Sequence, residues 1–271
     1  MAPDPSDFLA VDAELTAEER DIRDAVRDYA NAELAPRISE WYESNTLPRD
    51  IAKGLGALGL LGMHLEGYGC AGTNATSYGL ACRELEAIDS GLRSFVSVQG
   101  SLAMFAIHRW GSEEHKQTWL PRMATGEALG CFGLTEADAG SDPGSMRTRA
   151  RRDGSDWVLD GSKMWITNGT LADVAVVWAQ TDPDAGSKGI RGFVVPTDTP
   201  GFSVVRRLEK MGWHCSDTAE LAFVDCRVPA ANLLGTRGRG FAQFLRTLDE
   251  GRVAIAALSV GLAQGLSLIH I

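Results

Sequence analysis

The chain contains one run whose residue types point to chemistry, Cys131-Phe132-Gly133-Leu134-Thr135-Glu136-Ala137-Asp138-Ala139-Gly140-Ser141-Asp142. It begins with β-favouring residues and ends in a turn rich in small and hydroxyl-bearing residues. Small residues let a backbone approach a ligand closely. We therefore expect a strand that leads into a ligand-binding turn.

A second stretch, Lys163-Met164-Trp165-Ile166-Thr167-Asn168-Gly169, follows about twenty-five residues later, and the alternation of a strand places Trp165 and Thr167 on one face. An aromatic plate beside a hydroxyl suits a planar heterocycle that carries hydrogen-bonding atoms on its edge. A tryptophan in a strand usually belongs to a core, so this stretch alone is weak evidence for such a site.

The chain before these stretches has the pattern of helices. Thr16–Glu19 has the sequence of a capping box, and Pro48 is expected to open a second helix, with Leu55, Leu58 and Leu61 as its apolar stripe. Further helices are predicted over 77–88, 94–110 and 113–123. The segment 94–110 is apolar nearly all round, so it should be a buried central helix.

The pattern changes near Gly126, where short β-rich runs begin to alternate with turn residues, and it becomes helical again from Gly240. Many short strands at close spacing predict a β-barrel or sandwich, so the fold class is α+β and multidomain. The predicted domains are an N-terminal α-helical domain (1–126), a middle β domain (127–232) and the start of a C-terminal helical domain (233–265). The predicted strands are 130–134, 157–159, 164–167, 174–180, 192–196, 202–205 and 219–224.

Several other functions find little support in the sequence. Gly67–Gly72 matches G-x-G-x-x-G but follows a helix, where a dinucleotide loop must follow a strand, so a structural turn is expected. The net charge of −10 argues against a nucleic-acid partner. The histidines show no metal-ligand spacing, and five scattered cysteines without a C-x-x-C pair suggest reduced thiols in a cytoplasmic protein. The N-terminus resembles no targeting signal, and no stretch is expected to reach the length of a membrane span.

Together with a third string, Thr247-Leu248-Asp249-Glu250-Gly251-Arg252, the two stretches resemble the acyl-CoA dehydrogenase family over about residues 15–264. The resemblance implies a flavin enzyme that binds FAD and oxidises an acyl-CoA thioester to its 2,3-enoyl form. It implies that electrons pass to an electron-transfer flavoprotein and that the parent is a homotetramer. It also implies that Thr135 hydrogen-bonds the pyrimidine side of the flavin and that Ser141 faces the pyrophosphate and the CoA arm. Trp165 would pack on the isoalloxazine, and Thr167 would hydrogen-bond near its N5 atom. The cofactor residues by resemblance are Phe132, Gly133, Leu134, Thr135, Ser141, Trp165, Ile166 and Thr167, and Asp249 and Arg252 match positions that contact CoA.

The catalytic residue stays unknown. In most branches of the family the base is a glutamate well beyond residue 271, and in a minority it directly precedes the arginine of the third string. That position is Gly251 here, so Glu250 is in the wrong register by about 100° of helix rotation. The sequence therefore leaves open a non-catalytic FAD- and CoA-binding fragment, truncated at its C-terminus. Residues 266–271 resemble a translated sequencing adapter and are expected to be an artefact.

The acyl specificity has two readings. Asp89–Leu102 resembles glutaryl-CoA dehydrogenases, in which Arg93 and Ser94 would hold the distal carboxylate of the substrate before it is lost as CO2. Lys210–Gly212 and the third string look more like dehydrogenases of short or branched acyl chains. Glutaryl-CoA is slightly favoured. The structural alternative for Arg93 is an ion pair with Glu84, Glu86 or Asp89.

Overall fold

The fold is taken from a computed structural model that describes residues 7, 10–236 and 239–270. Most of the first nine residues, on which the expectation of no targeting signal rests, lie outside these ranges, as does Ile271 of the expected tail. The short 3-10 helices are η1 (Val11–Glu14), η4 (Pro143–Ser145), η5 (Pro183–Gly189) and η6 (Ala230–Asn232).

The N-terminal helices largely follow the sequence pattern. The predicted capping box is present: Thr16 Oγ1 accepts from Glu19 N at 3.2 Å, and Glu19 accepts from Thr16 N at 2.8 Å. The prediction that Pro48 opens a helix is wrong: residues 48–50 form a turn, and the helix begins at Ile51. Leu58, a predicted member of the apolar stripe of this helix, lies beyond its end and is exposed. The elements here are α1 (Ala17–Tyr29), a π-helical turn η2 (Ala30–Leu34), α2 (Ala35–Glu43), α3 (Ile51–Ala57) and α4 (Ala75–Ile88).

The predicted central helix is buried, as expected, but it begins four residues earlier than predicted. Asp89 caps it by accepting from Gly91 N at 2.7 Å. Its middle turns are π-helical, a geometry that often marks functional sites. The segment comprises α5 (Ser90–Ser97), η3 (Val98–Met104) and α6 (Phe105–Trp110), and α7 (Glu113–Ala124) follows.

The glycine-rich stretch 67–72 is a turn between helices. Gly67, Gly69 and Gly72 have φ of 76°, 83° and 71°, and the next helix is α4, at Ala75. No described strand precedes the stretch, so the backbone needs its glycines for left-handed conformations rather than for a phosphate.

Eight strands form the middle part, in the order β6-β7-β3-β2-β4-β5-β8, with β1 parallel to β4. Only the pair Arg149 and Gln180 joins β2 to β4, so the sheet has two halves. One buried cluster takes residues from both halves, including Leu159, Val177 and Phe223, which is the arrangement of a sandwich. The strands are β1 (Gly130–Gly133), β2 (Arg149–Asp153), β3 (Asp156–Thr167), β4 (Val174–Gln180), β5 (Ile190–Pro196), β6 (Phe202–Arg207), β7 (Thr218–Pro229) and β8 (Leu233–Leu234).

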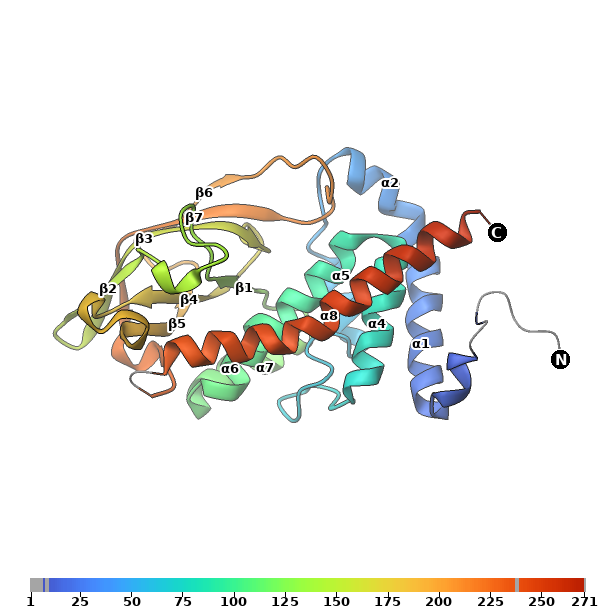
Figure 1. The fold of residues 1–271 in the computed structure, drawn as a ribbon, viewed down its shortest axis with the longest axis horizontal. Helices are drawn as coiled ribbons and strands as arrows, with labels where there is room; N and C mark the ends of the chain where they lie inside the picture. The colour runs from blue at the N-terminus through green and yellow to red at the C-terminus, as the bar shows by residue number, and fades with distance from the viewer. Residues whose placement is uncertain (1–6, 8–9, 237–238, 271) are drawn as a thin grey trace.

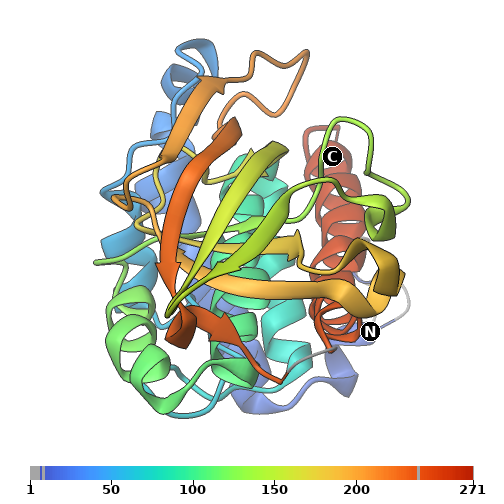
Figure 2. The ribbon, with the colours of Figure 1, turned by 90° about the vertical axis from the view of Figure 1, so that its left-hand side faces the viewer.

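Strand β4 connects the two cores of the molecule. Val174, Val176 and Trp178 face the helices, whereas Ala175, Val177 and Ala179 face the inside of the sandwich. Both faces are covered, so the strand is a continuous apolar run. In Figure 1 the sheet lies at one end of the molecule and most helices at the other, and Figure 2, viewed from the sheet end, shows the strands in front of the helices.

Helix α8 (Gly240–Leu268) runs along one side of both parts (Figure 1). By length and composition alone it could cross a membrane, so the expectation that no stretch reaches that length is wrong. It nevertheless packs closely on α4: a Cβ added to Gly261 would lie 2.6 Å from the Arg83 carbonyl oxygen. Leu245, Ile255, Val260 and Leu266 on other sides of α8 are exposed.

Candidate functional site

The two motif stretches, residues 131–142 and 163–169, meet at the end of β1. Met164 N in β3 donates to Thr135 O at 2.9 Å, so the turn after β1 lies against the C-terminal part of β3. Phe132, Leu134 and Ile166 are buried beneath this junction. The structure therefore brings together two groups of predicted cofactor residues that are some thirty positions apart.

Three hydroxyl groups at this junction are available to a ligand. Thr135 and Thr167 are half-buried and Ser141 is exposed. None of the three hydroxyls has a hydrogen-bond partner among the residues that the structure describes. A ligand with several acceptor and donor atoms on its edge, as a flavin has, fits this set.

Trp165 has an unusual backbone for a bulky residue. Its φ is 59°, in the left-handed region, and the pairing of β3 with β7 shifts register between Lys163 and Ile166. Such a conformation costs about 1–3 kcal/mol and concentrates at functional sites. The bulge leaves Trp165 61% exposed beside the junction, where its ring can pack on a planar ligand.

A buried ion pair lies directly under the junction. Lys163 Nζ is 2.7 Å from Glu136 Oε1 and donates to Leu134 O at 3.1 Å. Burial lowers the pKa of Lys163 to about 8, although the nearby Glu136 carboxylate opposes the shift. For Glu136, burial raises the pKa, but Lys163 and the hydrogen bonds from Thr148 and Arg147 outweigh burial and leave the pKa below its ordinary value.

Arg93 lies at the centre of a buried polar cluster in the helical part. Its Nε is 3.0 Å from Glu86 Oε2, and its Nη1 and Nη2 donate to Ser97 Oγ at 3.1 Å and Ser94 Oγ at 2.9 Å. Glu86 also accepts from the Ser90 hydroxyl. The ion pair foreseen as the structural alternative for Arg93 is therefore present, with Glu86 as the partner. Ser94 stays beside Arg93, as the substrate hypothesis requires.

A cavity of about 480 Å³ lies next to this cluster. Trp213 lines it and also places its ring 5.9 Å from the Arg93 guanidinium, so one side chain contacts both. Asp89 and Leu258 line other sides, and burial raises the pKa of Asp89. The volume lies within the range of small-molecule sites.

The third string lies on α8 and forms surface ion pairs. Arg252 pairs with Asp249 at 3.1 Å, and both are well exposed. Glu250 pairs with Arg246 at 3.1 Å. A Cβ at Gly251 would contact Leu102 of η3 at 3.5 Å, so position 251 faces the central helix. Glu250 and position 251 thus point in different directions, as the helix register predicts.

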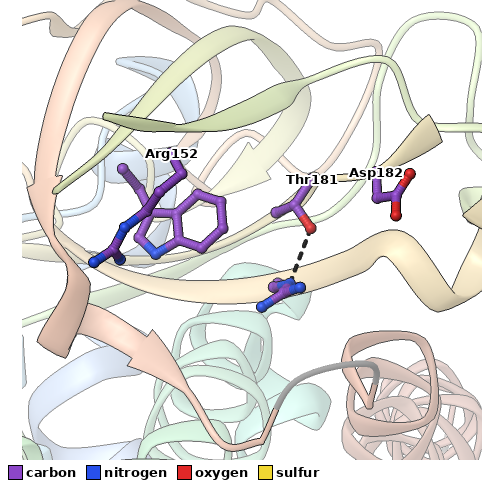
Figure 3. A pocket seen from close by; sticks show the side chains of 5 residues that line it. Arg152, Thr181 and Asp182 are labelled. Atoms are coloured by element: carbon purple, nitrogen blue, oxygen red, sulfur yellow. Dashed lines mark hydrogen bonds between the residues drawn. The ribbon is translucent and has the colours of Figure 1, made fainter. Parts of the chain in front are cut away.

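A second hollow of about 380 Å³ lies far from the junction, where β2, β3 and β5 meet (Figure 3). The guanidinium groups of Arg152 and Arg191 lie 5.5 and 5.4 Å from the Trp157 ring, and Arg191 Nε donates to Thr181 Oγ1 at 2.9 Å. Because two cations already stack on the ring, we read this hollow as a packed surface feature.

Two polar contacts that sequence reasoning missed hold the helical and β parts together. Gln99 donates to Met123 O and Ala128 O, both at 3.0 Å, and accepts from Gly130 N at 2.7 Å. Arg49 pairs with Asp173 at 2.5 Å. A glutamine inside an apolar helix pattern is the signal that could have identified the first contact.

Within the described ranges no group of three His, Cys, Asp or Glu side chains could hold a metal ion. All five cysteines are free thiols, and Cys82, Cys131, Cys215 and Cys226 are buried. Burial raises the pKa of the Cys82 and Cys131 thiols to about 12, which makes them poor nucleophiles.

Comparison with known proteins gives matches along most of the chain. Residues 16–127 match the model of the acyl-CoA dehydrogenase N-terminal domain, and residues 131–226 match the acyl-CoA dehydrogenase middle domain. A crystal structure of a glutaryl-CoA dehydrogenase from Mycobacterium smegmatis in complex with FADH2 is 57% identical, with a TM-score of 0.92, and the alignment covers 96% of this chain and 66% of that chain.

Curated relatives agree on the family. A probable acyl-CoA dehydrogenase of Bacillus subtilis is 43% identical over 93% of this chain and 67% of its own length. The mitochondrial short-chain specific acyl-CoA dehydrogenase of Rattus norvegicus is 40% identical over 90% of this chain and 59% of its own length. The chain therefore spans about two thirds or less of the length of these relatives.

Proposed function

Because this chain belongs to the acyl-CoA dehydrogenase family, we propose that it is the FAD- and acyl-CoA-binding part of an enzyme that oxidises an acyl-CoA to the 2,3-enoyl-CoA. The junction of β1 and β3 carries this proposal. It places the hydroxyls of Thr135 and Thr167, which have no hydrogen-bond partner in the described part of the chain, beside the strained, exposed Trp165.

FAD, when bound, would supply the acceptor for the β-hydrogen of the substrate. Thr135 and Ser141 would hold its pyrimidine and pyrophosphate portions, and Trp165 would cover one face and exclude water. Thr167 would donate a hydrogen bond at the reactive edge. Each of these residues orients the ligand and moves no proton.

The proposal is tested by titrating the purified chain with FAD while visible absorbance and flavin fluorescence are recorded. We expect saturable binding at about one FAD per chain. Thr135→Val and Thr167→Val should each weaken binding by about two- to thirteenfold, since each removes one hydrogen bond worth about 0.5–1.5 kcal/mol. A chain that stays colourless and takes up no FAD would refute the proposal.

For the substrate, we propose glutaryl-CoA, with decarboxylation, ahead of a short unsubstituted or branched acyl-CoA. The support is the buried Arg93, whose Nη groups are held by Ser94 and Ser97 beside the 480 Å³ cavity. The 57% identical structure is named a glutaryl-CoA dehydrogenase, while the rat relative is named short-chain specific. Glu86 pairs with the Arg93 Nε, and each Nη group donates one of its two N–H groups to a serine, which leaves one N–H on each for a substrate carboxylate.

Kinetics on a chain extended to the full length of its relatives test this choice. Glutaryl-CoA should be preferred to butyryl-CoA, and Arg93→Ala should lower kcat/KM for glutaryl-CoA by about ten- to a thousandfold while changing that for butyryl-CoA much less. Equal loss of both activities would make Arg93 structural and favour the short- or branched-chain alternative.

We further propose that the 271-residue chain binds FAD and CoA thioesters without turning them over. The support is the orientation of Glu250, which pairs with Arg246, and the glycine at position 251. Acyl-CoA turnover by this chain that Glu250→Gln abolishes would overturn the proposal. Electron-transfer flavoprotein as acceptor, a homotetrameric parent and a cytoplasmic location are further parts of the proposal.

A further inference from the structure

A single buried carboxylate closes the turn that carries two of the ligand-binding hydroxyls. Glu136 accepts from Lys163 Nζ at 2.7 Å, from Arg147 N at 2.6 Å and from Thr148 N at 3.0 Å. The turn therefore leaves β1 beside Thr135, passes Ser141 and returns at 147–148 to the same side chain. One side chain thus sets both ends of this turn.

The partner of this carboxylate reaches it from below β1. The side chain of Lys163 is fully buried, and its Cγ would lie 3.4 Å from a Cβ added to Gly133. Its ammonium group also donates to Leu134 O, the residue just before Thr135. Lysine and glutamate are almost never buried this deeply unless they are paired, so the two side chains depend on each other.

The same pair lies next to the strained residue. Lys163 precedes Trp165 by two positions, and Met164 N bonds Thr135 O between them. On the other side, Asn168, also in the left-handed region, donates to Gly130 O at 3.4 Å. The left-handed backbone of Trp165 is thus anchored on both sides to β1 and its turn, which is what strained positions require.

We propose that Lys163 and Glu136 are positioning residues that set the turn after β1 and the bulge at Trp165 in the geometry that receives the flavin. This inference rests on the proposed function. It gives the buried pair a role beyond stability, because the pair connects the two halves of one ligand site that are separate in the sequence. Neither side chain touches the ligand; both act through Thr135, Ser141 and Trp165.

The experiment uses the whole chain and the variants Lys163→Met and Glu136→Gln, with FAD as the probe. We expect FAD affinity to fall by about ten- to a hundredfold, and the visible circular dichroism of the bound flavin to change. Glu84→Gln is the matched control: Glu84 is a buried carboxylate paired with Arg27 and Arg83 in the helical part. It should lower thermal stability and leave FAD affinity within twofold of wild type.

The double variant Lys163→Met with Glu136→Gln leaves no unpaired buried charge at this site, so FAD affinity can be measured on it if a single variant does not fold. It should fold and still bind FAD at least tenfold more weakly. If the double variant folds and binds FAD with wild-type affinity, the inference is overturned and the proposed function still stands. If none of the variants folds, the pair is a stability element and the inference is also overturned. Absence of FAD binding by wild type overturns the proposed function and the inference together.

Discussion

Replacing Arg93 with alanine should destabilise this chain by about 3–5 kcal/mol, because removal of one partner leaves a buried charge without compensation. The charge left behind is Glu86, whose side chain has 0% exposure, while that of Arg93 has 3%. The Ser90 hydroxyl still donates to Glu86, which places the expected loss toward the lower end of that range. The hydroxyls of Ser94 and Ser97 lose a donor but can turn toward other groups.

Urea denaturation followed by circular dichroism measures this loss as a shift in midpoint at constant slope. Arg93→Met combined with Glu86→Gln should recover at least half of it, since no charge then remains unpaired. Arg122→Ala is the control, because its pair with Glu127 is largely exposed and should change stability by less than about 1 kcal/mol. An Arg93→Ala variant as stable as Arg122→Ala would show that Glu86 is hydrated or protonated and would refute the reasoning.

Three further predictions concern the fold. Thr16→Ala should lower the free energy of unfolding by about 1 kcal/mol in urea melts, because it removes the cap of α1; an unchanged midpoint would contradict the capping role. Gln99→Leu should cost about 3 kcal/mol, since it leaves the buried Ala128 O and Gly130 N unpaired while Met123 O keeps its bond from Gly126 N, and a loss below 1 kcal/mol would mean that water replaces the amide. The pKa of Lys163 is about 8 in the folded chain and 10.5 ordinarily. Between pH 8 and pH 10.5 the lysine is therefore more protonated in the unfolded chain than in the folded one, so this group makes the free energy of unfolding rise as the pH rises through that range. Lys163→Met should flatten that slope relative to wild type, and equal slopes would place the lysine pKa near its ordinary value.

Local patterns in the sequence were enough for much of the fold. The capping box at Thr16 involves groups three residues apart, and the apolar character of 94–110 and 174–180 follows from burial of whole elements. These features depend on neighbours along the chain, so periodicity and residue type reveal them. Strand β2 escaped prediction because four of its five residues are charged and only Ala150 is buried. The domain limits at 126 and 232 stay predictions.

The composition of the candidate site was also present in the sequence, as two strings with the residue types that a flavin needs. Its geometry was decided by the tertiary structure. Lys163 and Glu136 are 27 positions apart, and only the packing of β3 under β1 makes them a pair. The same packing creates the bulge that turns Trp165 outward at positive φ, whereas simple alternation gives no bulge. Likewise, three acidic residues near Arg93 were equivalent in the sequence, and the fold of α4 against α5 selected Glu86. Sequence determines which groups are available; long-range packing selects partners, because a buried charge must find its counter-charge in three dimensions.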